Sequence, residues 1–187
     1  MFIRNALAAA AILLSVTAGT AATTVLDLTT ATNDGTTLTM PDAAITAGTG
    51  TTLHVGDFIA NAVCPLGSLG CNGSMTLAFD FDVSNVAFDF GFGDPGDSAT
   101  ITGFDSIGNV VGTFLLSLTG GTDVASLDAF GTLRSILFDN TAASGFGYAY
   151  GNISFDPSAV PLPAALPLLL GGLAGLGALG ARRRKLA

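Results

Sequence analysis

The residues that could carry out chemistry are few in type. The chain of 187 residues has 2 cysteines, 1 histidine and 14 acidic residues, all of them aspartate. Cys64 and Cys71 have six residues between them, too many for a Cys-x-x-Cys redox site, and no second pair completes a zinc site. In a chain that leaves the cytoplasm, as the ends of this one indicate, an isolated close pair is most simply a disulfide that closes a loop. We therefore predict a Cys64–Cys71 disulfide.

The histidine and the aspartates do not form a recognisable catalytic set. His54 would need a serine or cysteine nucleophile and an orienting acid beside it. Asp57 is near in sequence, but the chain has no Gly-x-Ser-x-Gly turn to present a serine. A glycosidase needs two carboxylates across a cleft, and so many aspartates offer many arbitrary pairs. We expect no catalytic residues and no enzymatic activity.

Calcium binding by an acidic loop is the better chemical alternative. The loop from Asp94 to Asp97 follows Asp89, and carboxylate and carbonyl oxygens are the hard ligands that calcium prefers. Asp80 and Asp82 share one face of a predicted strand. A solvated acidic surface is the competing explanation for both groups, and the spacing matches no EF-hand loop. We predict no metal site and no cofactor, and at most weak calcium binding.

Residues 23–157 must position these side chains, and their pattern is that of short strands. The region lacks Glu and Lys and is rich in Thr, Gly, Asp and Phe. Bulky residues alternate with period two, which places them on one face of a strand, in Met75–Val83, Val86–Phe92 and Val110–Leu118. Further strands are predicted at Thr24–Thr30, Leu53–Val55, Ala99–Phe104, Leu133–Phe138 and Phe146–Phe155, with a short helical turn allowed within Thr122–Phe130.

Turn-forming residues separate the alternating segments. They stand at Ser84-Asn85, Gly93–Asp97 and Asp105–Asn109. About eight short strands at this spacing predict an all-β fold, with a single antiparallel β-sandwich between the two chain ends.

The charge of the chain is unevenly distributed. All 14 aspartates lie between Asp27 and Asp156, where Arg134 is the only base, so this span carries a formal charge of −13 in a chain of −8. Nucleic-acid binding requires a basic face, so we exclude it.

Residues 1–22 have the three parts of a signal peptide. Arg4 gives a short basic start, Ala6–Val16 is an apolar run, and Thr17–Ala22 supplies the small residues that signal peptidase requires. A retained anchor is the alternative, but the apolar run is short for a bilayer. We predict export through the inner membrane and cleavage after Ala21 or Ala22.

Residues 158–187 contain a candidate transmembrane helix at about 162–181. This uncharged run of about 20 residues, at about 1.5 Å per residue, can cross a hydrocarbon core of roughly 30 Å. Four bases follow the run: Arg182, Arg183, Arg184 and Lys185. Such a cluster stays in the cytoplasm. We therefore expect the preceding domain to lie outside the membrane and to be anchored by this helix.

A proline motif stands just before this helix and consists of Val160, Pro161, Leu162, Pro163 and Ala164. With the helix and the basic cluster, it resembles the VPLPA-type branch of the PEP-CTERM sorting signals. The resemblance implies that an exosortase, a membrane-embedded cysteine protease-transpeptidase, processes the chain near the prolines. Leu162 replaces the Glu of the commoner form, which points to the variant and leaves the exosortase subtype open. An anchor that is never cut is the alternative.

The middle of the chain also resembles the jelly-roll ectodomains that often precede such tails. The resemblance is carried by Asp89-Phe90-Gly91, by Ile101–Asp105 with Gly108–Gly112, and by Tyr150–Phe155. It implies an architecture similar to that of carbohydrate-binding modules. The last strand departs from the family pattern, because Gly151 takes the place of Asp in an Asp-Asn pair.

Three classes of function follow. The favoured one is a noncatalytic protein of a bacterial envelope or exopolysaccharide layer, whose partners are signal peptidase, the membrane, an exosortase and exopolysaccharide. The alternative is a carbohydrate-binding surface module, assisted by calcium and held by an uncut helix. That module would need an exposed aromatic platform, for which Tyr148 and Tyr150 are the only tyrosines in a chain without tryptophan. An extracellular hydrolase is third.

Overall fold

The computed structural model describes residues 22–56, 59–117, 120–141 and 147–158. The predicted signal peptide, except for its last residue, lies outside these ranges, as do the proline motif, the predicted transmembrane helix and the basic tail. Within the described ranges, no helix has the length and hydropathy that a membrane crossing requires.

Apart from one short 3-10 helix, the regular elements of the described residues are all strands, and every pair of strands is antiparallel. In chain order the elements are β1 (Thr24–Val25), β2 (Thr32–Asn33), β3 (Thr37–Thr39), β4 (Ala43–Ala47), β5 (Thr52–Val55), β6 (Ala62–Leu66), β7 (Ser74–Gly91), β8 (Ser98–Phe104), β9 (Val110–Leu116), β10 (Thr122–Ser126), the 3-10 helix η1 (Asp128–Phe130), β11 (Leu133–Thr141) and β12 (Ala149–Pro157).

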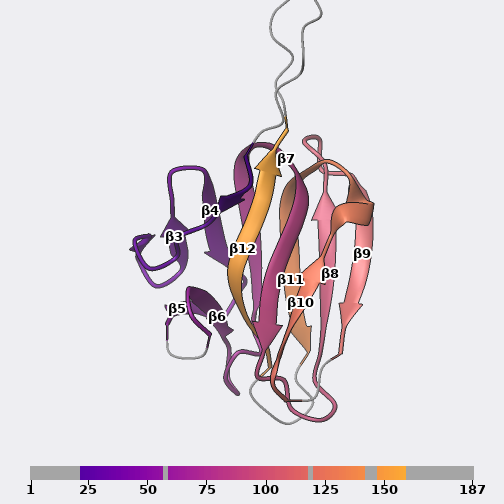
Figure 1. The fold of residues 1–187 in the computed structure, drawn as a ribbon. Helices are drawn as coiled ribbons and strands as arrows, with labels where there is room; N and C mark the ends of the chain where they lie inside the picture. The colour runs from indigo at the N-terminus through magenta and orange to yellow at the C-terminus, as the bar shows by residue number, and fades with distance from the viewer. Residues whose placement is uncertain (1–21, 57–58, 118–119, 142–146, 159–187) are drawn as a thin grey trace, which may run out of the picture.

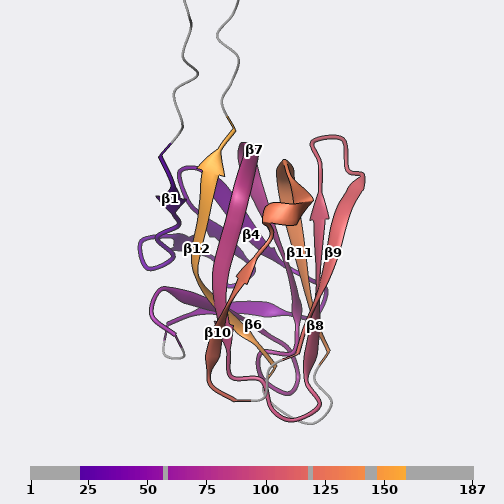
Figure 2. The same ribbon diagram turned by 45° about the vertical axis from the view of Figure 1, so that its right-hand side comes forward.

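The strands form two packed layers, as Figures 1 and 2 show. One layer has the order β2-β3-β4-β7-β11-β8-β9. In the other, β7 lies between β10 and β12, while β12 also pairs with β1 and β6, and β6 pairs with β5. The prediction of an all-β antiparallel sandwich is therefore confirmed.

Aromatic side chains fill the space between the layers. The ring of Phe88 contacts those of Phe138 and Tyr150, at centroid separations of 5.2 and 5.8 Å. Phe79 contacts Phe155 edge to face at 4.9 Å. Each of these side chains is almost fully buried, which stabilises the fold by about 1.5–3 kcal/mol per side chain.

Strand β7 belongs to both layers. Its first half pairs with β4 and β11 and its second half with β10 and β12. Figure 1 shows it arching from one layer to the other at the top of the view. Inward-facing residues alternate as far as Val83, but the next buried residue is Val86. The extra residue is a bulge, which is how strands turn the corners of sandwiches.

The prediction that a turn at Ser84-Asn85 separates two strands is therefore wrong. The strand runs through these residues, because Asn85 takes a positive φ of 51° while the β12 register shifts beside it. Asparagine tolerates this left-handed conformation better than most residues.

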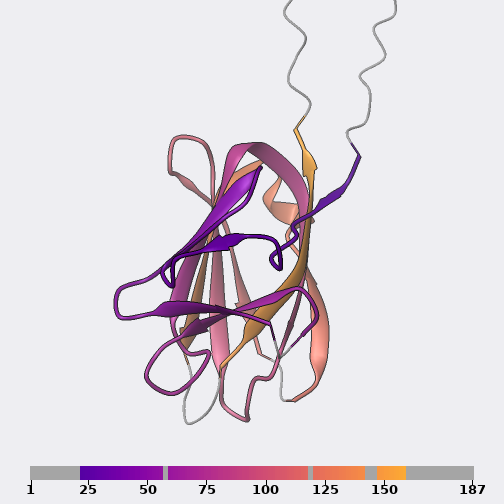
Figure 3. The same ribbon diagram turned by 90° about the vertical axis from the view of Figure 1, so that its left-hand side faces the viewer.

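A carboxylate links the first and last strands beside this bulge. Asp156 accepts hydrogen bonds from the Thr23 hydroxyl at 2.6 Å and from the Asn85 amide at 2.8 Å, and these bonds hold the pKa of Asp156 below its usual value. Their contribution to stability is present at neutral pH and is lost as the pH falls through that lowered pKa. Thr24 pairs with Phe155, so both ends of the domain leave the sandwich from the same end (Figures 2 and 3).

The alternation pattern does not predict β2, β3, β4 or β6. β2 and β3 have two and three residues, too few for a period to show. Four of the five residues of β6 are buried, so its two faces do not differ in polarity.

Two predicted segments are only partly right. β1 covers just the first two residues of the strand predicted at Thr24–Thr30, because Asp27 accepts a hydrogen bond from the Thr29 amide at 3.0 Å and turns the chain. The helical turn allowed within Thr122–Phe130 is confirmed only as η1, because β10 occupies the first part of that segment.

We expect Asn85→Val to lower the free energy of unfolding by about 1–3 kcal/mol, because a β-branched residue is strained at positive φ. Asn85→Gly should cost less, since glycine adopts this φ freely. Urea unfolding measures both, with Thr76→Val in the regular part of β7 as the control. Equal losses for the valine and glycine variants would contradict a conformational role for Asn85.

Candidate functional site

The predicted disulfide is present. Cys64 in β6 and Cys71, just before β7, are bonded, with their Cα atoms 5.1 Å apart, and both are buried. Inside the loop that they close, the Gly67 amide donates to the Gly70 carbonyl at 2.8 Å. The chain-entropy effect of so short a loop is worth at most about 2–3 kcal/mol.

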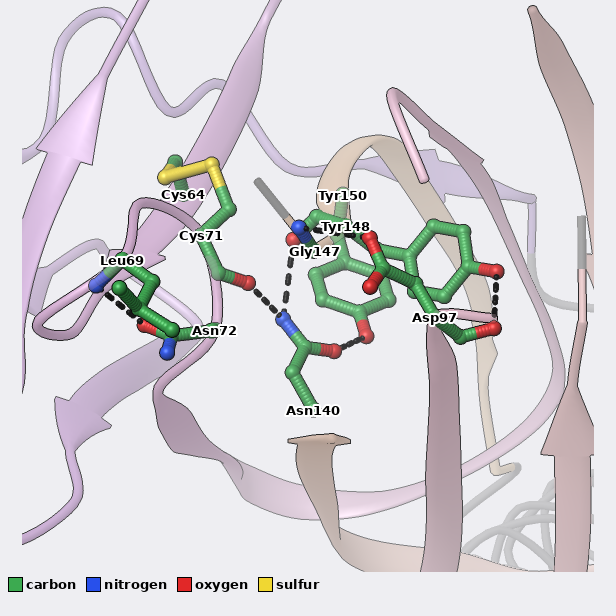
Figure 4. The surroundings of a disulfide bond; sticks show 9 residues. All are labelled: Cys64, Leu69, Cys71, Asn72, Asp97, Asn140, Gly147, Tyr148 and Tyr150. Atoms are coloured by element: carbon green, nitrogen blue, oxygen red, sulfur yellow. Dashed lines mark hydrogen bonds between the residues drawn. A yellow bond between two sulfur atoms is a disulfide. The ribbon is translucent and has the colours of Figure 1, made fainter. Parts of the chain in front are cut away.

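A buried amide connects this loop to the two strands at the end of the domain (Figure 4). The side-chain amide of Asn140 donates to the Cys71 carbonyl and, at 3.1 Å, to the Tyr148 carbonyl. Its oxygen accepts a hydrogen bond from the Tyr150 hydroxyl. Burial raises the pKa of that hydroxyl well above its ordinary value, so it stays a neutral donor. Both polar atoms of the Asn140 side chain are therefore used in hydrogen bonds within the domain.

The tyrosines do not form an exposed platform. Tyr148 and Tyr150 are fully buried, and their rings pack against Phe90 and Phe138 at centroid separations of 5.7 and 4.6 Å. This corrects the expectation that they could stack on a sugar. Alternation in the last strand could not predict this burial, because the four consecutive residues Tyr148–Gly151 are all buried.

The acidic loop is held together by one of its own carboxylates. Asp97 is only 3% exposed, and its carboxylate accepts hydrogen bonds from the backbone amides of Asp94 at 2.8 Å and Gly147 at 3.1 Å. Its carbonyl accepts one from the Tyr148 hydroxyl at 3.2 Å. Asp97 therefore closes its own loop and holds it to Gly147 and Tyr148; Figure 4 shows the bonds to these two residues.

The other candidate ligands lie apart from this loop or are engaged elsewhere. Asp89 accepts a hydrogen bond from the Asn152 amide at 2.7 Å, and Asp82 lies 3.7 Å from the guanidinium of Arg134. Asp80 is exposed on the face that it shares with Asp82. Among the described residues, no three His, Cys, Asp or Glu side chains gather as metal ligands would. Weak calcium binding stays a prediction.

The structure places the catalytic candidate His54 in an ordinary strand pairing. It lies in β5 directly opposite Cys64, whose sulfur is part of the disulfide. Asp57, the nearest acid in sequence, lies outside the described residues.

The described residues form a polar groove beside the disulfide loop, which is a concave site for a ligand. It has a volume of about 320 Å³. Its lining joins the β4–β5 connection, the disulfide loop and the starts or ends of two strands: Thr49, Gly50, Thr51, Gly67, Ser68, Asn72, Gly73, Ser74 and Asp139. Hydroxyl, amide and carboxylate groups in this set can donate to and accept from the hydroxyls of a ligand.

Close packing of two loops builds the groove. Gly73 lies against Thr51, so a Cβ at that glycine would be 2.4 Å from the Thr51 methyl and 2.9 Å from the Pro65 carbonyl oxygen. The Gly48 amide also donates to the Ser74 carbonyl at 2.8 Å. The sequence pattern does not predict this site, because its residues are the same Thr, Gly, Ser and Asn that form ordinary turns.

Comparison with known proteins gives a fold likeness only. No family model matches the chain, and no curated protein matches it. Among solved structures, a variant of CBM29-2, a family 29 carbohydrate-binding module, is 17% identical, with a TM-score of 0.44, covering 73% of this chain and 92% of that one. Two further CBM29-2 variants, complexed with mannohexaose and with cellulohexaose, are each 17% identical over the same shares, with TM-scores of 0.43.

We expect Asn140→Leu to lower the free energy of unfolding by about 2–4 kcal/mol, because it leaves the Cys71 carbonyl and the Tyr150 hydroxyl buried without their partner. Asn109→Ala, at an exposed turn, is the control and should cost less than about 1 kcal/mol. Urea unfolding compares the two. Losses of equal size would show that Asn140 does not hold the loop to the strands.

Proposed function

We propose that this chain is an exported, noncatalytic protein of a bacterial envelope or exopolysaccharide layer. Signal peptidase removes residues 1–22, and the helix at about 162–181 anchors the domain until an exosortase processes the tail near the VPLPA motif. The disulfide supports export, because such bonds form and persist in oxidising compartments. The domain then acts on the cell surface or outside it.

The position of the groove relative to the ends of the described domain is the observation that supports this proposal. Pro157, at the end of the domain, pairs with Val83 on β7, whereas Ser74 of the groove begins that strand. These two β7 residues are nine positions apart, or about 30 Å at roughly 3.3 Å per residue. A tail held at the membrane would therefore present the groove to the outside.

The tail has the properties that a processing enzyme requires. The motif begins at Val160, two residues after the last described residue, Ser158. Its prolines disfavour helix and sheet, which favours access by a protease. Cleavage there would release an intact domain, since the last strand ends at Pro157.

We expect the double variant Pro161→Ala, Pro163→Ala to accumulate as the full-length membrane form, because the motif is lost. Pro167→Ala, a proline in the same tail but outside the motif, is the matched control and should be processed normally. Membrane fractionation and the size of the product measure both. Normal processing of the double variant would contradict recognition through the motif.

A second candidate function, carbohydrate binding, is favoured by the polar lining of the groove. Sugars present many hydroxyls, which hydroxyl, amide and carboxylate side chains can bind. In this case the tail would anchor the module uncut, and calcium would assist. Asp139 is exposed at the groove and is the only charged residue among the described residues that line it.

We expect a glycan that binds the groove to lose about tenfold or more in affinity in Asp139→Asn, because a hydrogen bond to a charged group is removed. Asp123→Asn on β10, away from the groove, is the control and should bind as the unchanged protein does. A glycan array followed by calorimetry, with and without a chelator, makes the measurement. Absence of any bound glycan, or equal binding by both variants, would eliminate this second function.

A further inference from the structure

The polar groove beside the disulfide loop contains a carboxylate that the domain does not use for its own fold. Asp139, near the end of β11, is exposed and is the only charged residue among the described residues of the lining. Its neighbours on the two adjacent strands are Ser74 and Thr100, which are uncharged. Within the described part of the chain, the Asp139 carboxylate makes no hydrogen bond and no ion pair.

The chain provides no base beside this carboxylate. Between Asp27 and Asp156, Arg134 is the only lysine or arginine. It lies on β11 five residues before Asp139, or about 16 Å at roughly 3.3 Å per residue, and its guanidinium is 3.7 Å from the Asp82 carboxylate. The charge of Asp139 is therefore left for a cation of the solvent or for a cationic ligand.

Other groups of the groove are suited to a hydroxylated ligand. The side-chain oxygen of Asn72 accepts a hydrogen bond from the Leu69 amide at 3.3 Å, and this bond fixes which end of the side chain points away from Leu69 (Figure 4). The NH₂ group at that end makes no hydrogen bond within the described residues, so it can donate to a ligand. Thr49 and Ser68 add hydroxyls, which both donate and accept.

Charge determines which glycans suit this groove. The span from Asp27 to Asp156 has a formal charge of −13, so glycans that carry carboxylates or sulfates are repelled. A neutral sugar would offer only hydroxyls to the Asp139 carboxylate. A protonated amine on the sugar would form a hydrogen bond between two charged groups, which is shorter and roughly twice as strong as a neutral one.

We propose that the groove binds amino sugars that have a free, protonated amine, with the ammonium group at Asp139. The inference rests on the carbohydrate-binding function proposed above and names its ligand class, which is a glycan of hexosamines that lack some of their N-acetyl groups. The groove volume of about 320 Å³ is at the small end of the range for ligand sites, roughly 300–1,000 Å³. The groove therefore contacts a short part of such a glycan.

Three hexasaccharides with the same backbone linkage test this ligand class. Chitosan hexaose, chitin hexaose and cellulohexaose carry an amine, an N-acetyl group and a hydroxyl at the same ring position. In calorimetry with the full chain, at a pH that keeps the amine protonated, we expect chitosan hexaose to bind about tenfold or more tightly than the other two. Asp139→Asn should abolish this preference. Asp123→Asn on β10 should retain it, because that residue is not part of the groove lining.

A second variant adds charge to the groove. Asn72→Asp keeps a side-chain oxygen that can accept from the Leu69 amide and places a second carboxylate in the lining. We expect the affinity for chitosan hexaose to rise by about threefold or more, whereas the affinity for the neutral hexasaccharides should not rise. No gain for chitosan hexaose would contradict an ammonium site in the groove.

The outcomes separate this inference from the function on which it rests. Equal binding of chitosan hexaose and chitin hexaose, or a preference that persists in Asp139→Asn, would overturn the amine site and leave carbohydrate binding in place. If none of the three binds, the inference is overturned, and the glycan array described above decides whether the carbohydrate-binding function stands. Hexalysine tests charge alone. Binding of hexalysine as tight as that of chitosan hexaose, with the same loss in Asp139→Asn, would indicate a site for basic peptides and overturn the sugar class.

Discussion

One strand shared by two sheets is the constraint on which the rest of this structure depends. β7 can serve both layers only because an extra residue between Val83 and Val86 reverses which side chains face inward, and Asn85 supplies the backbone conformation for it. With that reversal, Phe79 and Phe88 both reach the same core. The bend also places the two ends of the described domain at one pole, whereas the start of β7, with its groove, lies at the other.

Polar side chains around the disulfide loop and the acidic loop mostly hold the fold together. Asn140 and Asp97 use their side chains to fix the disulfide loop and the acidic loop against the last strands. Buried polar groups of this kind rigidify a structure only when their partners are in place. Other polar groups line the groove, where hydroxyl, amide and carboxylate side chains can bind the hydroxyls of a ligand.

The sequence predicts the sandwich, most of its long strands and the disulfide, because alternation and an isolated cysteine pair are local signals. It does not predict that Asn85 continues a strand, since a turn residue and a bulge residue have the same local preference. Burial of Tyr150 and assembly of the groove around Thr51 and Asp139 depend on contacts between distant segments. Exposure of Phe114 likewise depends on which strand ends the sheet, and a single-strand pattern cannot contain that information.

Under the proposed function, an exported domain is cut from its tail near the VPLPA motif. Intact-mass analysis of the protein isolated from its native envelope tests this most directly. We expect a mass that lacks both the residues before about 23 and the segment 166–187. A mass that retains 166–187 would contradict sorting by cleavage and leave a plain membrane anchor.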